Sequence, residues 1–276
     1  MGIFNSILNF IFDTFFNSFD SLHPIYGLSA ISLLTTLIVL PIFRYFSNQE
    51  GIKRTRGRIV GHLFEVRIFK DDLRIFFTAM KNILKYNAIY MAYMLKPLLF
   101  MILPVLVIMV QTETRYAHRP LSLGETAIVK VKQETGGTFP EKGSDVLLTV
   151  PEGLRLETPP LRYDEGSETY WKIRAERKGE FELRFYVLDK ELKRRVVVKD
   201  EITRISPLML KKGILNSFFH PGEPSLSQST NIKSIEVKYP YMNISVFGWR
   251  IHWLLIFFIL TLSFGFVLMK PFRVKF

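Results

Sequence analysis

Cysteine is absent from this sequence of 276 residues. Disulfide bonds, thiolate metal sites and cysteine catalysis are therefore excluded, and any extracytoplasmic part must fold without covalent cross-links. Motifs of other catalytic classes are missing too, since the sequence has no GxSxG, no P-loop and no HExxH. The five histidines are far apart in the chain, and the paired acids are best explained as solvated surface. We therefore expect no enzyme activity, no metal and no cofactor.

Charge is missing from three long apolar runs, which cover residues 24–43, 97–112 and 251–269, apart from a possible charge on His252. The first has 20 uncharged residues, enough to cross a hydrocarbon core of about 30 Å, and the third is nearly as long. The middle run has only 16, roughly 24 Å of helix, and contains Pro97 and Pro104. It can still span if the helix extends backward through residues 86–95 or if the bilayer thins.

Positive charge is concentrated beside these runs. In a soluble protein, a formal net charge of +12 would indicate a nucleic-acid partner. However, residues 44–96 hold 11 Lys and Arg against 4 Asp and Glu, whereas residues 113–247 hold 22 against 19. The positive-inside rule then makes residues 44–96 and the tail from Lys270 cytoplasmic. We expect three crossings of a lipid bilayer, the prokaryotic plasma membrane, with the N-terminus outside and no nucleic-acid partner.

The pattern along the chain predicts an α-helical membrane protein that carries an all-β domain. Residues 1–22 are expected to form an interfacial amphipathic helix whose polar face holds Asn5, Asn9, Asp13 and Asn17. Residues 23–112 supply the first two transmembrane helices, 24–43 and about 90–112, with a cytoplasmic helical hairpin over residues 50–95. Alternating strands over residues 113–205 predict an extracytoplasmic immunoglobulin-like β-sandwich. Residues 206–248 are expected to form an interfacial connector, with a short helix within 206–219 and a strand over 234–241 that leads back to the membrane. Residues 249–276 are expected to form the third transmembrane helix with a cytoplasmic tail.

The hairpin is predicted from apolar positions that recur at intervals of three and four. Asp71 or Asp72 can cap its second helix. The basic faces of the hairpin are either solvated or held on anionic headgroups, or they receive a client or a ribosome. The apolar positions are Ile59, Leu63, Val66 and Phe69, then Leu73, Phe76, Phe77, Met80, Ile83 and Leu84, and the polar Asn87 continues the same spacing.

Polar residues within the apolar runs are the candidate functional residues. Ser29, Ser32 and Thr36 share one helix face, where they either serve helix packing or line a polar groove. Arg44 and Gln111, at the ends of the first and second helices, complete the groove-lining candidates; their simplest roles are a topology anchor and a headgroup contact. The candidate anchors at the membrane interface are Lys96, Trp249, Arg250 and Trp253.

The order of these parts resembles the YidC/Oxa superfamily of membrane protein insertases, in particular its three-helix branch of archaeal YidC-like proteins and the related subunit of the ER membrane protein complex. The stretches LIVLPIFRYFSNQ (37–49) and KPLLFMILPVLVIM (96–109) carry the resemblance, which covers residues 24–112 and 249–269. It implies insertion of helices through a hydrophilic groove in a thinned bilayer. Two features depart from the family: Thr35 and Thr36 stand where bacterial members have a groove arginine, and the sandwich is not part of the family core.

Two functions follow as hypotheses. The first is an insertase-like protein that assists insertion or folding of membrane proteins, with nascent membrane proteins or a membrane subunit as partners. The alternative is a non-catalytic scaffold, anchored in the membrane, whose β-domain binds an envelope partner.

Overall fold

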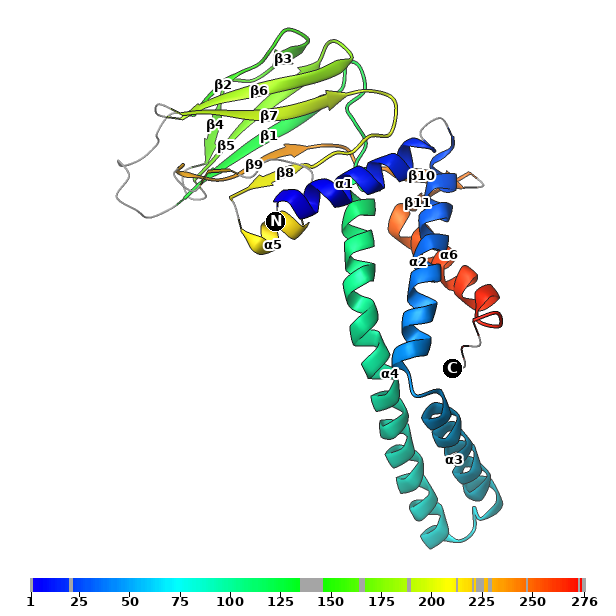
Figure 1. The fold of residues 1–276 in the computed structure, drawn as a ribbon. Coiled ribbons are helices and arrows are strands. Elements are labelled where there is room, and N and C mark those ends of the chain that lie inside the picture. The colour runs from blue at the N-terminus through cyan, green and yellow to red at the C-terminus, as the bar shows by residue number, and fades with distance from the viewer. Residues whose placement is uncertain are drawn as a thin grey trace. The chain divides into compact units, whose positions relative to one another are not determined.

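The computed structural model describes residues 2–19, 22–134, 146–163, 167–187, 190–211, 213–219, 221, 226–227, 230–246, 248–272 and 274. It combines helices with antiparallel sheets (Figure 1), which confirms the mixed fold class expected from the sequence. The chain forms two compact units. We name Met1–Gly27 with Met109–Trp253 the sandwich unit, and Leu28–Ile108 with Leu254–Phe276 the helical unit.

The helical unit contains α2 (Pro24–Phe46) from Leu28 onward, α3 (Gln49–Ile68), α4 (Leu73–Tyr116) as far as Ile108, and α6 (Trp253–Leu268) from Leu254. Side-chain caps fix where α3 and α4 begin. The Asn48 side chain accepts a hydrogen bond from the Gly51 N–H at 2.9 Å. Asp72 Oδ1 accepts from the backbone N–H groups of Arg74 and Ile75 at 3.0 and 3.1 Å. Of the two aspartates expected to cap α4, Asp72 is the one that does so.

α4 is one uninterrupted helix of 44 residues, about 66 Å long. The sequence had predicted a hairpin helix and a second transmembrane helix with a boundary near residues 90–95, and the structure shows no break there. Pro97 and Pro104 lie inside the helix, where each removes one backbone hydrogen bond. Among the described residues, α2 and α4 are the two helices that are long and apolar enough to cross a membrane.

α6 begins later than expected. Trp249–His252 form strand β11, which pairs with β10 (Asn243–Val246) in a two-stranded hairpin, and Gly248 supplies the positive φ of +84° that the turn needs. The helix that follows has 16 residues, about 24 Å, and a hydrocarbon core is about 30 Å thick. The helix predicted within residues 249–276 therefore begins only at Trp253, and the third crossing stays a prediction.

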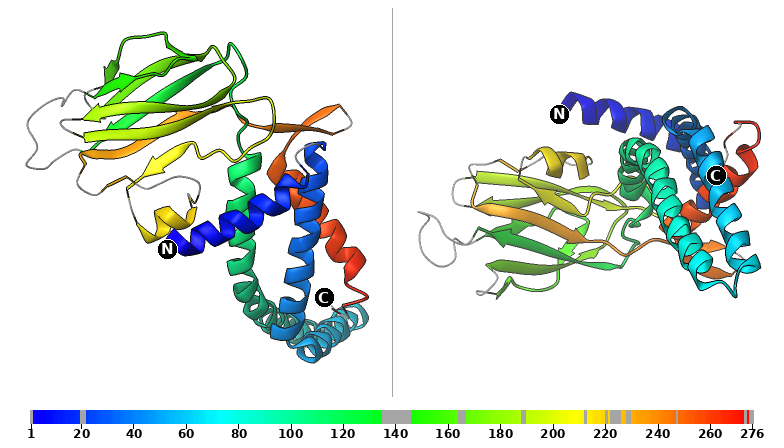
Figure 2. Two further views of the ribbon diagram at one scale, coloured as in Figure 1. Left: turned by 45° about the horizontal axis from the view of Figure 1, so that its top comes forward. Right: turned by 90° about the horizontal axis from the view of Figure 1, so that it is seen from below.

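Besides the β10–β11 hairpin, the sandwich unit contains two larger antiparallel sheets, which lie as two layers in Figure 1 and are seen from two further sides in Figure 2. The larger sheet has the order β3-β5-β1-β9-β8, with β4 also beside β5, and the smaller has the order β2-β6-β7. The strands are β1 (Thr126–Gln133), β2 (Leu147–Thr149), β3 (Leu154–Leu156), β4 (Leu161–Tyr163), β5 (Glu168–Ala175), β6 (Gly179–Val187), β7 (Lys190–Val198), β8 (Leu208–Leu210) and β9 (Ile232–Lys238).

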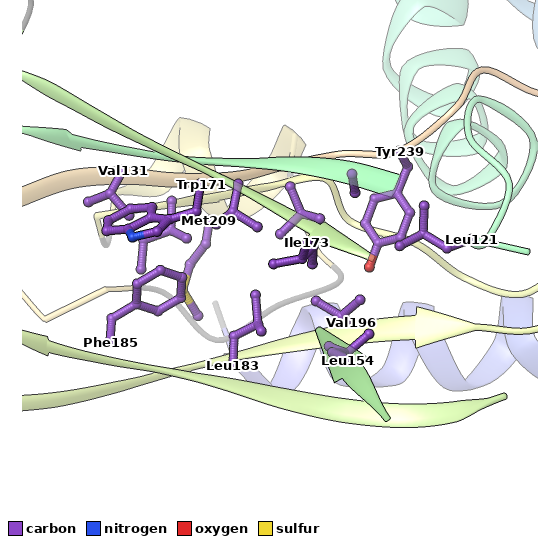
Figure 3. Packing of buried hydrophobic residues seen from close by; sticks show 14 of the residues in the cluster. Leu121, Val131, Leu154, Trp171, Ile173, Leu183, Phe185, Val196, Met209 and Tyr239 are labelled. Carbon is purple, nitrogen blue, oxygen red and sulfur yellow. The ribbon is translucent and has the colours of Figure 1, made fainter. Parts of the chain in front are cut away.

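Alternation along these strands builds the core between the two layers. On β1, Val129 and Val131 are fully buried, while Lys130 between them faces away from the core. From β5, Trp171 points toward Phe185 of β6 (Figure 3), and their rings meet edge to face with centroids 6.1 Å apart. The core therefore replaces the disulfide that a cysteine-free sandwich cannot have.

The larger sheet extends beyond the predicted domain. β9 lies between β1 and β8, with Val237 opposite Val129, so residues 232–238 are a central strand of the sheet. The short helix and the strand expected within residues 206–248 do occur, as α5 (Ile214–Phe219) and β9, but β8 and β9 belong to the sheet and not to a connector. The chain enters and leaves the sandwich side by side: Arg119 N–H donates to the Pro240 carbonyl at 3.0 Å and Met242 N–H to the Ala117 carbonyl at 3.0 Å.

The N-terminal helix, α1 (Gly2–Asn17), belongs to the sandwich unit. Phe12 and Phe16 are buried, whereas Ile7, Phe10 and Ile11 are exposed. Three side chains of the polar face, those of Asn9, Asp13 and Asn17, contact other groups of the same unit, as described below.

Candidate functional site

The hydroxyl face of α2 packs against α6. Ser32, Thr35 and Thr36 are buried, and Ser29 is half-buried. The Ser32 hydroxyl donates to the Phe257 carbonyl at 3.4 Å, and the Thr36 hydroxyl contacts the Ser32 and Thr261 carbonyls at 2.9 and 3.3 Å. These contacts favour helix packing over a wet groove for this face, because the hydroxyls are already hydrogen-bonded inside the helical unit.

The two basic candidates of the helical unit, Arg44 and Lys96, are exposed. Below Arg44 on α2, Leu40 and Phe43 form a small buried cluster with Val274, against which Met101 of α4 also packs. Phe46 stacks on Phe100 of α4, with ring centroids 3.9 Å apart. These contacts join α2, α4 and the segment after α6 at the end that the charge pattern assigns to the cytoplasm, and leave Arg44 pointing away as an anchor would.

The remaining candidates lie in the sandwich unit. Trp249 and Arg250 are exposed on β11, while Trp253 is only 4% exposed and so does not present its ring at a surface. Gln111 is 3% exposed, which disagrees with the expected headgroup contact. Its side-chain amide donates to Asn9 Oδ1 at 3.1 Å and accepts from Arg204 Nη2 at 3.1 Å.

Gln111 belongs to a polar network, which we name the α1 clasp, formed by Asn9, Asp13, Asn17, Gln111, Arg115 and Arg204. Asp13 Oδ1 lies 3.1 Å from Arg204 Nη2 and 3.7 Å from Arg115 Nη1. Arg115 also donates to Asn17 Oδ1 at 3.3 Å and lies over the Phe16 ring. Burial lowers the pKa of the Arg204 guanidinium, which the Asp13 charge partly offsets. The clasp thus attaches α1 to the end of α4 and to the loop after β7.

Sequence reasoning missed this network, because its two arginines are 89 positions apart (204 − 115) in the chain. A signal was present nonetheless. Asn9, Asp13 and Asn17 are spaced by four on one face of α1, and α1 contains no lysine or arginine to pair with Asp13. Such an acid-bearing helix face needs a cation from elsewhere in the fold.

In the hairpin, α3 and α4 meet along a seam of side chains that leaves much apolar surface outside. Ile59 and Val66 of α3 and Phe76 and Ile83 of α4 are half-buried, and Ala79 is buried. The other apolar positions that the sequence assigned to the seam are exposed. We name five residues on one face of α4 the α4 strip, each between 56 and 67% exposed: Leu73, Phe77, Leu84, Met91 and Leu95.

Polar and aromatic groups surround one opening of the seam. An open hollow of about 500 Å³ is lined by Arg56 and Ile59 of α3 and by Asn87 and Tyr90 of α4. One turn further on, Arg58 donates to the Tyr86 hydroxyl at 3.2 Å, and His62 stacks on the Tyr86 ring. These contacts fix the two helices of the hairpin against each other.

Within the residues that the structure describes, no three His, Asp or Glu side chains gather in a way that could hold a metal ion. Comparison of the chain with family models, with curated proteins and with solved structures finds no match.

Proposed function

We propose that this chain is an insertase-like integral membrane protein, of the YidC/Oxa kind, that assists the insertion or folding of other membrane proteins. In this proposal the hairpin is cytoplasmic and the sandwich is extracytoplasmic. The α4 strip is the observation that carries it. Its spacing of 4, 7, 7 and 4 residues keeps all five side chains within about 40° of one another around the helix.

The strip continues into the apolar part of the same helix. Leu98 and Ile102 fall on the same face and are exposed as well, at 48 and 42%. Because α4 is unbroken, an apolar segment held on Leu84 or Met91 has a continuous apolar surface toward the bilayer. Burying apolar surface is worth about 25 cal/mol per Å², so partial contact along the strip holds a client weakly enough to release it into lipid.

The Ser29, Ser32 and Thr36 face has a different role in this proposal. Ser32 and Thr36 hold α6 through its backbone carbonyls. The client path therefore follows α4 instead of a groove lined by these hydroxyls. The short α6, if it crosses, requires a thinned bilayer, which also lowers the cost of moving a polar client segment across.

Photo-crosslinking tests this path in full-length protein. A photoreactive residue at Leu84 or Met91 should label nascent membrane proteins, whereas one at Thr78, which is exposed on another face of α4, should not. A second pair compares Leu98 with Leu33, an exposed apolar residue of α2. Equal labelling at Leu84 and Thr78 would count against an insertase role for the strip.

The scaffold function remains the second candidate because the sandwich has its own core and a paired entry stem. Arg119 and Pro240 are hydrogen-bonded neighbours, so residues 120–239 can be replaced by a short glycine-serine turn without pulling the stem apart. The replacement also removes Arg204 from the α1 clasp, so Arg204→Ala in the full chain is its matched control. A shorter deletion over residues 120–205 would leave β9 without β1. The excised protein should still crosslink clients from Leu84 if the chain is an insertase. A scaffold should lose all function.

A further inference from the structure

α3 has an apolar face of its own, on the side opposite the seam with α4. We name it the α3 strip: Gly57, Val60, Gly61, Phe64 and Ile68. The three large side chains are between 43 and 68% exposed, and all five residues fall within an arc of about 100° around the helix. The side chains that face α4, such as Thr55 and Ile59, lie on the other half of the helix. Among the residues that the structure describes, the strip is thus an unpartnered helix face.

The two glycines of the strip relieve no contact within the described part of the chain, because a Cβ added to Gly57 or Gly61 would meet none of its atoms within 4 Å. A glycine in a helix interior costs about 0.5–1 kcal/mol relative to alanine, so the pair weakens α3 without relieving any contact in this fold. The smooth surface they leave suits the close approach of another helix backbone, which small residues spaced by four permit.

Charge identifies the chemistry of the occupant. The strip is bordered by Lys53 and Arg54 at one end and by Arg67 at the other, all exposed. Over its whole length α3 carries Lys53, Arg54, Arg56, Arg58 and Arg67 against Glu50 and Glu65. A second copy of this chain would bring like charges together, which opposes pairing. An anionic membrane surface would match the charge, but larger apolar residues than glycine would serve it better.

We propose that the α3 strip is the docking site for an α-helix of another protein, one with a narrow apolar face bordered by Asp and Glu. This partner helix would pack across Gly57 and Gly61, with its acids beside Lys53, Arg54 and Arg67. The site goes beyond the proposed insertase function, which uses the α4 strip, and crosslinking from Leu84 is unaffected if the α3 strip has no partner.

Cysteine labelling tests the proposal, because the chain has no native cysteine. Val60→Cys is placed in the strip and Thr78→Cys, on exposed α4 surface, is the matched control. The test uses native membranes prepared so that maleimide reaches their cytoplasmic face. Maleimide should label Val60→Cys about tenfold more slowly than Thr78→Cys, because a strip that is free about a tenth of the time reacts about a tenth as fast. After purification into nanodiscs of the native lipids, the two rates should become equal.

Each alternative occupant has its own outcome. Shielding of Val60→Cys that persists in nanodiscs would show that lipid covers the strip, and a Val60→Cys disulfide between two chains would show a second copy. Equal labelling in native membranes would mean that nothing covers it. Any of these overturns the proposal.

Two further variants examine the glycines and the charges. Gly57→Leu with Gly61→Leu should restore fast labelling of Val60→Cys in native membranes, since the added side chains occupy the space of the partner helix. Because an added Cβ meets no atom of the described residues within 4 Å, the double variant should keep its helical circular dichroism. A wash at about 1 M salt, where the Debye length is about 3 Å, should also expose Val60→Cys. Shielding that survives both changes would overturn the proposal.

Discussion

At the scale of single residues, the α1 clasp places two arginines around one carboxylate. The side chains of Arg115 and Arg204 are 6 and 13% exposed, whereas Asp13 is 40% exposed. Removing one partner of a buried ion pair costs more than the pair itself contributes, because the other charge is left without compensation. Asp13 is therefore the residue of the clasp whose loss the fold tolerates least.

Asp13→Ala should lower the free energy of unfolding by about 2 kcal/mol, between the ~0.5 kcal/mol of an exposed pair and the ~4 kcal/mol of a buried one. Thermal unfolding of the full chain in detergent, followed by tryptophan fluorescence, measures the effect. The control is Glu113→Ala, which removes an exposed acid from the same end of α4. An equal loss for both variants would refute the role of the clasp.

A second residue-scale prediction concerns acid. Hydrogen bonds from Tyr170, Lys130 and Lys132 lower the pKa of Glu168 from its ordinary 4.5 to about 2. Because the pKa is lowered on folding, the ionised carboxylate stabilises the sandwich above about pH 4.5, and this contribution is lost as the pH falls toward about 2. Glu168→Gln should reduce stability at neutral pH and flatten its decline in acid.

The measurement is the unfolding temperature of the full chain between neutral pH and about pH 2, the pKa of Glu168 in the folded protein. Glu152→Gln, at an exposed turn position, should keep the slope of the unmodified protein. If Glu168→Gln shows that same slope, the hydrogen bonds around Glu168 do not stabilise the fold as described.

The sequence predicts the role of a single residue where its hydrogen-bond partners lie close to it in the chain. The Asp72 cap was among the expected choices because its partners are two and three residues away. The sequence could not decide whether Ser32 and Thr36 line a polar groove or pack against another helix, since their hydrogen-bond partners on α6 are 225 positions away in the chain. For the same reason the sequence predicted a headgroup contact for Gln111, because its hydrogen-bond partners Asn9 and Arg204 are far from it in the chain.

At the scale of elements, the start of α4 sets the hairpin tip. Asp72→Ala should remove the cap and cost about 1 kcal/mol, so the first turn of α4 should open about fivefold more often. Limited trypsin digestion reads this out as faster cleavage after Arg74. Asp71→Ala is the matched control, because Asp71 is an equally exposed acid next to the cap. Similar acceleration in both variants would show that charge at the tip, and not the cap, controls opening.

The sequence predicted helices and strands where their residue pattern is long. It failed where packing or pairing with another element determines the place of a strand or which residues of a helix are buried. The alternation of residues 168–175 and 179–187 is enough to predict β5 and β6. β9 alternates as well, but only its pairing with β1 shows that it lies inside the sheet. Leu73 and Phe77 fit the helical period of the seam, yet they are exposed while Phe76 and Ile83 are half-buried, since a single partner helix covers only part of a broad apolar face.

At the scale of the whole molecule, the proposals depend on which compartment each segment occupies. Reagents that do not cross membranes can report this directly in a chain without native cysteine. Lys70→Cys marks the hairpin tip, Glu152→Cys the sandwich and Pro271→Cys the segment after α6, all at exposed positions. Labelling of Lys70→Cys and Glu152→Cys from the same side of intact cells would contradict both the insertase and the scaffold proposals.

The third crossing makes a separate prediction for Pro271→Cys. α6 covers about 24 Å, so it crosses only where the bilayer thins toward that length, and Lys270 at its end then lies on the cytoplasmic side. In intact cells an impermeant maleimide should therefore label Glu152→Cys, while Lys70→Cys and Pro271→Cys should react only after permeabilisation. If Pro271→Cys reacts together with Glu152→Cys, α6 does not cross, and the excess positive charge of the tail is not a cytoplasmic signal.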